Sequence, residues 1–183
     1  MRFIGISGSL RKASTNTGVL RYASEAFTKA GHEFSIVNIG HLPFMNEDLE
    51  VGGLPEDVLN FKKEVESADG ILFGCPEYNY GVTPAMKNAL DWASRSGNSW
   101  AGKPAGIIGS GGGFGTGRAQ LVLRQSFIFL DIHPLNKPEV CIRRFVQPSP
   151  FDADGNLIDD GIKAQVDKLV DALIDWTKKL SNL

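Results

Sequence analysis

The chain has 183 residues, 42% of them hydrophobic, and a formal net charge of −2 at pH 7. That length predicts one domain, spanning residues 1–183, with a sizeable core. The near-neutral charge excludes a general attraction to nucleic acid or to anionic membranes. No apolar run approaches the ~20 residues that span a bilayer, and an apolar strand begins almost at once, which leaves no room for a signal peptide. We therefore expect a cytoplasmic protein with no nucleic-acid and no membrane partner.

The cysteines and histidines add two further expectations. Cys75 and Cys141 lie far apart in the sequence, which favours buried free thiols in a reducing compartment over a disulfide. The three histidines, His32, His41 and His133, show no metal-ligand spacing with each other or with cysteine. We therefore predict no metal site.

Strands and helices are predicted to alternate along the whole chain. Apolar runs predict strands at residues 2–7, 34–38, 71–75, 105–109 and 139–143. Apolar residues at helical spacing predict helices at residues 15–30, 55–68, 84–95, 118–130 and 161–180. Residues 40–54 are predicted to form a long loop whose Leu42, Pro43 and Phe44 pack against the rest of the protein.

This alternation predicts an α/β fold in which helices cover both faces of a parallel sheet. Five strands suit the flavodoxin-like strand order 2-1-3-4-5. In such a sheet a ligand binds outside the carboxyl ends of the strands, at the switch point between strands one and three. We therefore expect a site among the loops that follow the first, third and fourth predicted strands.

The first of these loops, residues 7–17, is rich in side chains that donate hydrogen bonds to an anion. It carries one guanidinium, that of Arg11, and leads into a predicted helix, whose N-terminus stabilises negative charge. It lacks the glycine motifs for triphosphates and dinucleotides, so it suits a single terminal phosphate. A plain helix N-cap uses the same residue types, and this alternative stays open. The candidate donors are Ser7, Ser9, Ser14, Thr15, Asn16 and Thr17.

The other two loops suit a flat ring. Residues 76–83 combine two tyrosines, an asparagine and a glycine, and residues 109–117 hold six glycines. Taken singly, they are typical of rim aromatics, a simple turn and a flexible connector. Together, at the ends of neighbouring strands, they favour a site, since glycines let backbone approach a ring. A phosphate at the first loop and a flat heterocycle at the others predict flavin mononucleotide (FMN).

Three stretches resemble a known family. They are Gly-Ser-Leu-Arg-Lys at residues 8–12 with Asn16, Pro-Glu-Tyr-Asn-Tyr at residues 76–80, and Lys-Asn-Ala-Leu-Asp-Trp-Ala-Ser-Arg at residues 87–95. Together they resemble the NADPH-dependent FMN reductases, in particular the branch of NAD(P)H:quinone oxidoreductases and chromate reductases. The glycine run and the Leu-Arg-Gln at residues 123–125 are similar to the same branch.

The resemblance implies tightly bound FMN and a homodimer or homotetramer with the flavin near the subunit interface. It implies that the phosphate is held by Ser9, Arg11, Asn16 and Thr17, with Ser14 as a further candidate. It implies that one side of the flavin ring is lined by Pro76, Glu77, Tyr78, Asn79 and Tyr80. It implies that the other edge is lined by Ser110, Gly111, Gly112 and Gly113, with Phe114 and Gly117 as further candidates.

The activity expected from this resemblance is two-electron transfer from NADPH or NADH, through FMN, to a quinone. Chromate, azo compounds and free flavin are alternative acceptors, because each needs the same open ring face. Donor and acceptor sharing that face predicts ping-pong kinetics, and we expect no catalytic acid or base because the flavin carries the chemistry. Two alternatives stay open: a flavodoxin-like one-electron carrier, and a flavin-binding regulator without turnover.

Overall fold

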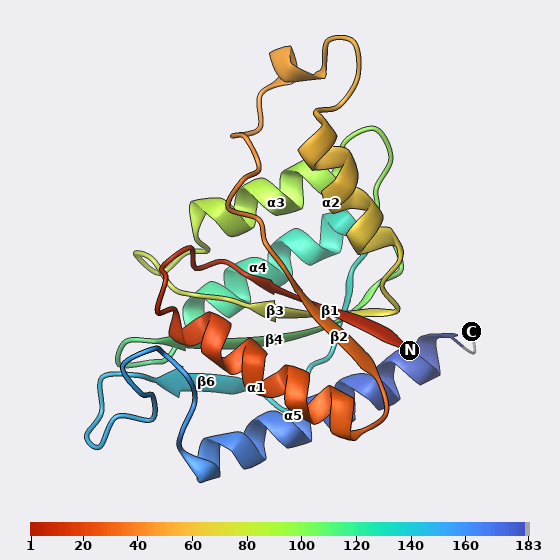
Figure 1. Cartoon of the computed structure of the whole chain (residues 1–183). Helices are drawn as coiled ribbons and strands as arrows, with labels where there is room; N and C mark the ends of the chain where they lie inside the picture. The colour runs from red at the N-terminus through yellow and green to blue at the C-terminus, as the bar shows by residue number, and fades with distance from the viewer. Residues whose placement is uncertain (182–183) are drawn as a thin grey trace.

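The computed structural model describes residues 1–181, along which strands and helices alternate (Figure 1). The strands are β1 (Arg2–Ser7), β2 (Glu33–Val37), β3 (Gly70–Gly74), β4 (Pro104–Gly111), β5 (His133–Pro134) and β6 (Val140–Arg143). The helices are α1 (Thr15–Lys29), the short 3-10 helix η1 (Glu47–Glu50), α2 (Glu56–Glu66), α3 (Pro84–Ser94), α4 (Gly117–Leu130) and α5 (Asp160–Ser181). Every strand and helix predicted from the sequence is present, and η1 and β5 are additional.

The strands pair in parallel in one sheet, in the order β2-β1-β3-β4-β5, and β6 pairs with β4 as well. The flavodoxin-like order 2-1-3-4-5 is confirmed, but the prediction of five strands is one short. The two-residue β5 pairs with the start of β4, and β6, the predicted fifth strand, pairs with its end. Residues 135–139 separate β5 from β6, whereas only Gly106 and Ile107 separate their partners on β4, so the chain leaves the ladder between the two strands.

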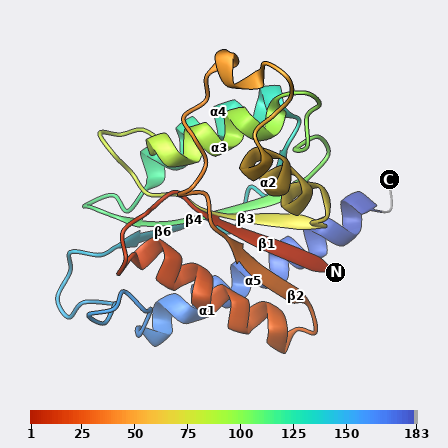
Figure 2. The same ribbon diagram turned by 45° about the horizontal axis from the view of Figure 1, so that its top comes forward.

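Helices cover both faces of the sheet, as Figure 2 shows: α1 and α5 lie on one face, and α2, α3 and α4 on the other. Each face has its own hydrophobic core, and the side chains of β1 alternate between the two. Phe3 belongs to the core under α1 and α5, whereas Ile4 and Ile6 belong to the other. Strands that are buried on both faces have continuous apolar sequences, which is why apolar runs predicted them.

Residues 40–54 form an arm that extends beyond the sheet at the top of Figure 1. Leu42 is buried as predicted, but the prediction for Phe44 was wrong, because its side chain is 78% exposed. Hydrogen bonds to the backbone hold this part of the arm instead. The Trp92 Nε1–H donates to the Pro43 carbonyl at 2.7 Å, and Asn88 Oδ1 accepts from the Met45 amide at 2.7 Å. With its backbone anchored in this way, the arm leaves the Phe44 ring free to face solvent.

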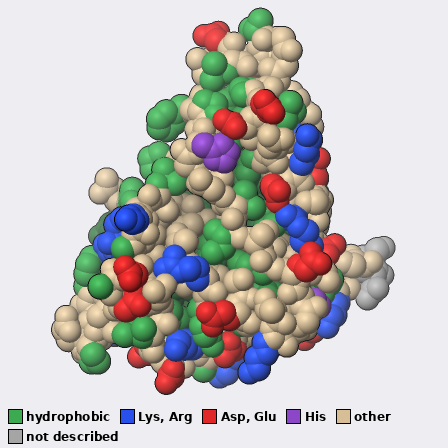
Figure 3. Space-filling model, in the orientation of Figure 1, with side chains coloured by type: hydrophobic (Ala, Val, Ile, Leu, Met, Phe, Trp, Pro, Cys, Tyr) green, Lys and Arg blue, Asp and Glu red, His purple; other side chains and the backbone are tan. Residues whose placement is uncertain are grey.

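Charges of both signs are interspersed on the surface over α1 and α5, in the lower half of Figure 3. This arrangement agrees with the small net charge of the chain. Over residues 1–181, none of the helices combines the length and the apolar character that crossing a membrane requires.

Candidate functional site

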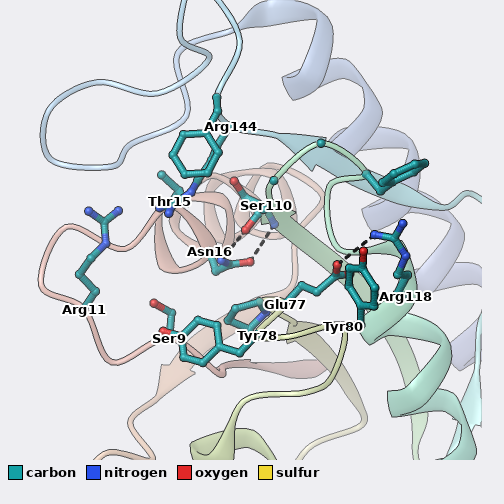
Figure 4. Close-up of a pocket in the computed structure, with 16 residues that line it drawn as sticks. Ser9, Arg11, Thr15, Asn16, Glu77, Tyr78, Tyr80, Ser110, Arg118 and Arg144 are labelled. Atoms are coloured by element: carbon teal, nitrogen blue, oxygen red, sulfur yellow. Dashed lines mark hydrogen bonds and ion pairs between the residues drawn. The ribbon is translucent and has the colours of Figure 1, made fainter.

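A cavity of about 550 Å³ opens at the carboxyl ends of β1, β3 and β4, among the loops that follow these strands (Figure 4). This volume lies within the usual range for small-molecule and cofactor sites, and the position is the one expected for a parallel sheet of this order. The residues that line it are Ser9, Arg11, Thr15, Asn16, Pro76, Glu77, Tyr78, Tyr80, Ser110, Gly111, Gly112, Gly113, Phe114, Arg118, Arg144 and Phe145.

The structure brings most of the sequence-predicted site residues to this cavity. Those that line it are Ser9, Arg11, Asn16, Pro76, Glu77, Tyr78, Tyr80, Ser110, Gly111, Gly112, Gly113 and Phe114. Ser14, Thr17, Asn79 and Gly117 do not line it. The Ser14 hydroxyl caps α1 by accepting a hydrogen bond from the Thr17 amide at 3.1 Å, and the Thr17 hydroxyl donates to Ser7 Oγ at 3.0 Å. For Ser14, the helix-cap alternative therefore describes the observed contact.

Three lining residues were missed by the sequence analysis as site candidates. Arg118 lies in the first turn of α4, and Arg144 and Phe145 directly follow β6. A signal for the last two was available, because they follow a predicted strand at the same edge of the sheet as the other loops. The fourth loop of the site is therefore the one after β6.

A tight turn of glycines forms one wall of the cavity. The Gly115 amide donates to the Gly112 carbonyl at 2.9 Å, with Gly115 at a φ of 62°. A Cβ on Gly111 would lie 2.3 Å from the Gly115 carbonyl oxygen, so this position requires glycine. A Cβ on Gly112 or Gly113 would meet nothing within 4 Å. The turn thus presents bare backbone to the cavity at two successive residues.

A two-residue turn of unusual conformation forms the opposite wall. Tyr78 and Gly81 exchange backbone hydrogen bonds of 3.1 and 2.9 Å, and between them Asn79 and Tyr80 have φ angles of 50° and 68°. Positive φ at both central residues is the signature of a type I′ turn. A positive φ is uncommon for a tyrosine such as Tyr80, and backbone strain of this kind is concentrated at functional sites. The turn holds both tyrosine rings at the cavity instead of in the core.

Asn16 joins the first loop to the end of β4. Its Nδ2 donates to the Ser110 carbonyl at 2.9 Å, and its Oδ1 accepts from the Ser110 amide at 2.8 Å. Both bonds are buried, so Asn16 fixes the start of the glycine turn relative to α1. Ser110 lines the cavity, and its hydroxyl is the one buried side-chain oxygen or nitrogen in residues 1–181 without a hydrogen-bond partner. A buried polar atom of this kind is satisfied when a ligand supplies the partner.

Glu77 connects the tyrosine turn to the first turn of α4. Its Oε2 accepts from the Ala119 amide at 3.1 Å, and its Oε1 lies 3.7 Å from a guanidinium nitrogen of Arg118. The Arg118 guanidinium lies between two rings, 4.0 Å from the centre of Tyr80 and 4.2 Å from that of Phe114. Figure 4 shows Arg118 and Tyr80 at the right of the cavity. The three side chains Tyr80, Arg118 and Phe114 therefore form one stacked edge of the cavity.

The two cysteines are free, and neither has the properties of a reactive thiolate. Burial raises the pKa of the Cys75 thiol to about 12, and burial also raises the pKa of Cys141. Both stay protonated at neutral pH, which excludes a thiolate nucleophile at the site. The expectation of buried thiols holds for Cys75, whereas Cys141, in β6, is an exposed residue whose thiol is only partly buried.

Comparison with known proteins assigns the chain to a family. Residues 1–147 match the NADPH-dependent FMN reductases, and the chain belongs to that family. Its relatives include a probable NADPH:quinone oxidoreductase of Oryza sativa, 48% identical over 184 residues, which cover 98% of this chain and 93% of the relative. Another is an NAD(P)H-dependent FMN reductase of Pseudomonas aeruginosa, 43% identical over 98% of this chain and 97% of the relative.

A solved structure shares the fold over nearly its whole length. It is the flavoenzyme NAD(P)H:(acceptor) oxidoreductase FerB from Paracoccus denitrificans, with a TM-score of 0.86 and 34% sequence identity. The match covers 97% of each chain. The family resemblance and the fold expected from the sequence are both confirmed by these matches.

Proposed function

We propose that this protein is an FMN-dependent NAD(P)H:quinone oxidoreductase whose residues 1–183 form one FMN-binding domain. The observation that carries the proposal is the meeting of three unlike loops at one cavity: the donor-rich turn with Arg11, the tyrosine turn and the bare glycine turn. Membership of the NADPH-dependent FMN reductases supports the same function. When bound, FMN supplies the two-electron redox chemistry that links oxidation of NAD(P)H to reduction of a quinone.

The donor-rich side of the cavity suits the phosphate of FMN. Ser9, Arg11 and Thr15 line it and can all donate hydrogen bonds to phosphate oxygens. Asn16 uses its amide to hold Ser110, so its contribution to binding is to position the glycine turn. Ser14 and Thr17 contribute by shaping the first turn of α1, where the helix dipole favours negative charge.

The remaining walls suit a flat heterocycle with hydrogen-bonding edges. Gly112 and Gly113 expose backbone without a side chain in the way, and the unpartnered Ser110 hydroxyl can bind a polar edge. Pro76, Glu77, Tyr78 and Tyr80 line the opposite side. Asn79 contributes through the strained turn that holds the two tyrosines. Because these groups lie at the sides of the cavity, one face of a bound ring is left for the donor and the acceptor in turn.

The direct test is FMN uptake followed by turnover. The purified protein should bind FMN and oxidise NADPH or NADH when benzoquinone is present. Because one open face serves donor and acceptor, double-reciprocal plots at several quinone concentrations should be parallel, and intersecting lines would contradict the shared face. Failure to take up FMN would overturn the proposal. An FMN-loaded protein that does not oxidise either nicotinamide would leave only the carrier or regulator alternatives.

A Gly112→Leu protein should keep its stability and lose FMN affinity. The added side chain meets nothing within 4 Å in the cavity wall and the residue has no positive φ, so we expect less than about 0.5 kcal/mol change in unfolding free energy. A leucine side chain would occupy the space proposed for the ring, and FMN binding should weaken at least about tenfold, or ~1.4 kcal/mol. Fluorescence titration measures the affinity, and thermal unfolding is the control. If the folded variant bound FMN as tightly as the parent, the flavin ring would not lie against the glycine turn.

We also propose a homodimer or homotetramer assembled through α4. Leu121, Ile128 and Phe129 lie on one side of this helix and are 65%, 84% and 87% exposed, an apolar patch typical of an interface. Ile128→Glu should therefore lower the mass measured by light scattering to that of a smaller assembly. Leu59→Glu, at an exposed leucine of α2, is the matched control and should leave the mass unchanged. A parent protein that is monomeric would contradict this assembly.

A cytoplasmic location fits the same function. Its support is the pair of free thiols, which suit a reducing compartment, together with the use of NAD(P)H as the proposed donor.

A further inference from the structure

Two arginines from different loops lie on the same side of the cavity. Arg11 belongs to the turn after β1, and Arg144 follows β6. Figure 4 shows both with Thr15, on the opposite side of the cavity from Arg118 and Tyr80. The Arg144 amide donates to the Gly111 carbonyl at 2.9 Å, which ties this residue to the end of β4. Arg144 is thus a fixed part of the cavity wall and not a member of a remote loop.

The Arg144 guanidinium is held in place without a carboxylate. It lies 4.3 Å from the centre of the Phe145 ring, and among residues 1–181 no acidic side chain lies within ion-pair distance of Arg144 or Arg11. Arg118, by contrast, is paired with Glu77. Burial lowers the pKa of Arg144, and the charge of Arg11 lowers that pKa further.

Two uncompensated cations beside hydroxyl donors define the ligand chemistry. Arginine stays charged at neutral pH, so the two guanidinium groups repel each other until an anion lies between or beside them. A phosphate monoester carries close to two negative charges at pH 7 and offers three acceptor oxygens. Arginine binds such a group through two parallel N–H donors. A phosphate monoester therefore matches this side of the cavity in charge and in hydrogen bonding.

We propose that Arg144 is a second phosphate-binding arginine, which acts with Arg11 on the terminal phosphate of FMN. This inference rests on the proposed function, since it concerns the same cavity. The first-loop donors Ser9 and Thr15 complete the set around the phosphate. Because the two arginines belong to the loops after β1 and β6, the ligand would also hold these two loops together.

The experiment compares FMN with riboflavin, which has the same ring and no phosphate. Full-length parent, Arg144→Met and Arg11→Met proteins, freed of flavin, are titrated with each ligand by fluorescence. Arg144→Met should weaken FMN binding roughly 10- to 100-fold, the usual effect of removing a charge-assisted hydrogen bond, and change riboflavin binding less than about threefold. Arg144→Lys should recover part of the loss. Arg143→Met is the matched control. Arg143 is exposed and does not line the cavity, and its substitution by methionine removes the same charge.

Each outcome decides the inference. Equal losses for FMN and riboflavin would show that Arg144 supports the wall and not the phosphate. An Arg144→Met protein that binds FMN like the parent would overturn the inference while leaving the proposed function intact. If that variant instead showed a raised KM for NADPH and not for NADH, Arg144 would bind the 2′-phosphate of the donor, which also contradicts the inference. A parent that binds neither flavin would reject the proposed function itself, and the inference with it.

Discussion

An Asn16→Leu protein should unfold at a lower urea concentration than the parent, with its free energy of unfolding reduced by about 2–6 kcal/mol. Leucine is similar in size but cannot replace the two hydrogen bonds that Asn16 makes with the Ser110 backbone at 2.9 and 2.8 Å. Both backbone groups would be left buried without a partner, at about 1–3 kcal/mol each. Urea titration followed by circular dichroism measures the difference.

The control is Asn60→Leu, since Asn60 is an exposed residue of α2. An exposed substitution of this kind should change the unfolding free energy by less than about 0.5 kcal/mol. If Asn16→Leu were as stable as the parent, the connection between α1 and the glycine turn would not depend on Asn16. The glycine turn should also lose its fixed position in this variant, so FMN binding should weaken along with stability.

Gly18→Ala should destabilise the protein by roughly 3 kcal/mol, opposite in sign to the usual effect of this change. In an exposed helix, alanine is more favourable than glycine by about 1 kcal/mol. At residue 18 of α1, however, the new Cβ would lie 1.7 Å from the carbonyl oxygen of Gly155. Backbone cannot yield as a flexible side chain can, so either the helix or the loop around Gly155 must shift. Thermal and urea unfolding would both report the loss.

Gly117→Ala gives the matched comparison. Gly117 is the first residue of α4, and its Cβ would find only the Cys141 sulfur, at 3.8 Å, which is ordinary contact. This variant should be neutral or more stable by up to about 1 kcal/mol. If both variants were destabilised to the same extent, the close contact between Gly18 and the Gly155 carbonyl would not be the cause of the loss in Gly18→Ala.

The main features of the fold were predictable from local pattern. Strands covered on both faces are continuous apolar runs, and each helix has an amphipathic period with a clear start, such as Pro84 after the capping Thr83. The short β5 was not predictable, because two residues ending in Pro134 carry no periodicity. The exposure of Phe44 depends on distant anchors, Asn88 and Trp92, which no local pattern reveals.

The site was predictable to the extent that it follows strand ends. The loops after β1, β3 and β4 were expected to meet because parallel strands bring their carboxyl ends to one edge. Arg144 and Phe145 were missed although they follow a predicted strand, and their exact place at the cavity depends on the pairing of β6 with the end of β4. The stacking of Arg118 between Tyr80 and Phe114 likewise requires the backbone conformation of two turns, which residue types alone do not specify.

The Glu77 carboxylate, which contacts both the Ala119 amide and Arg118, has a consequence for how substrates enter. Moving the tyrosine turn away from α4 would break the hydrogen bond from the Ala119 amide, the ion pair with Arg118 and the stacking of Arg118 on Tyr80 at the same time. We therefore expect this edge of the cavity to keep a constant width while substrates bind, without a hinged lid there. The thickness of an electron acceptor would then decide whether it binds. Planar acceptors should react, and puckered or bulky acceptors of equal redox potential should react more slowly.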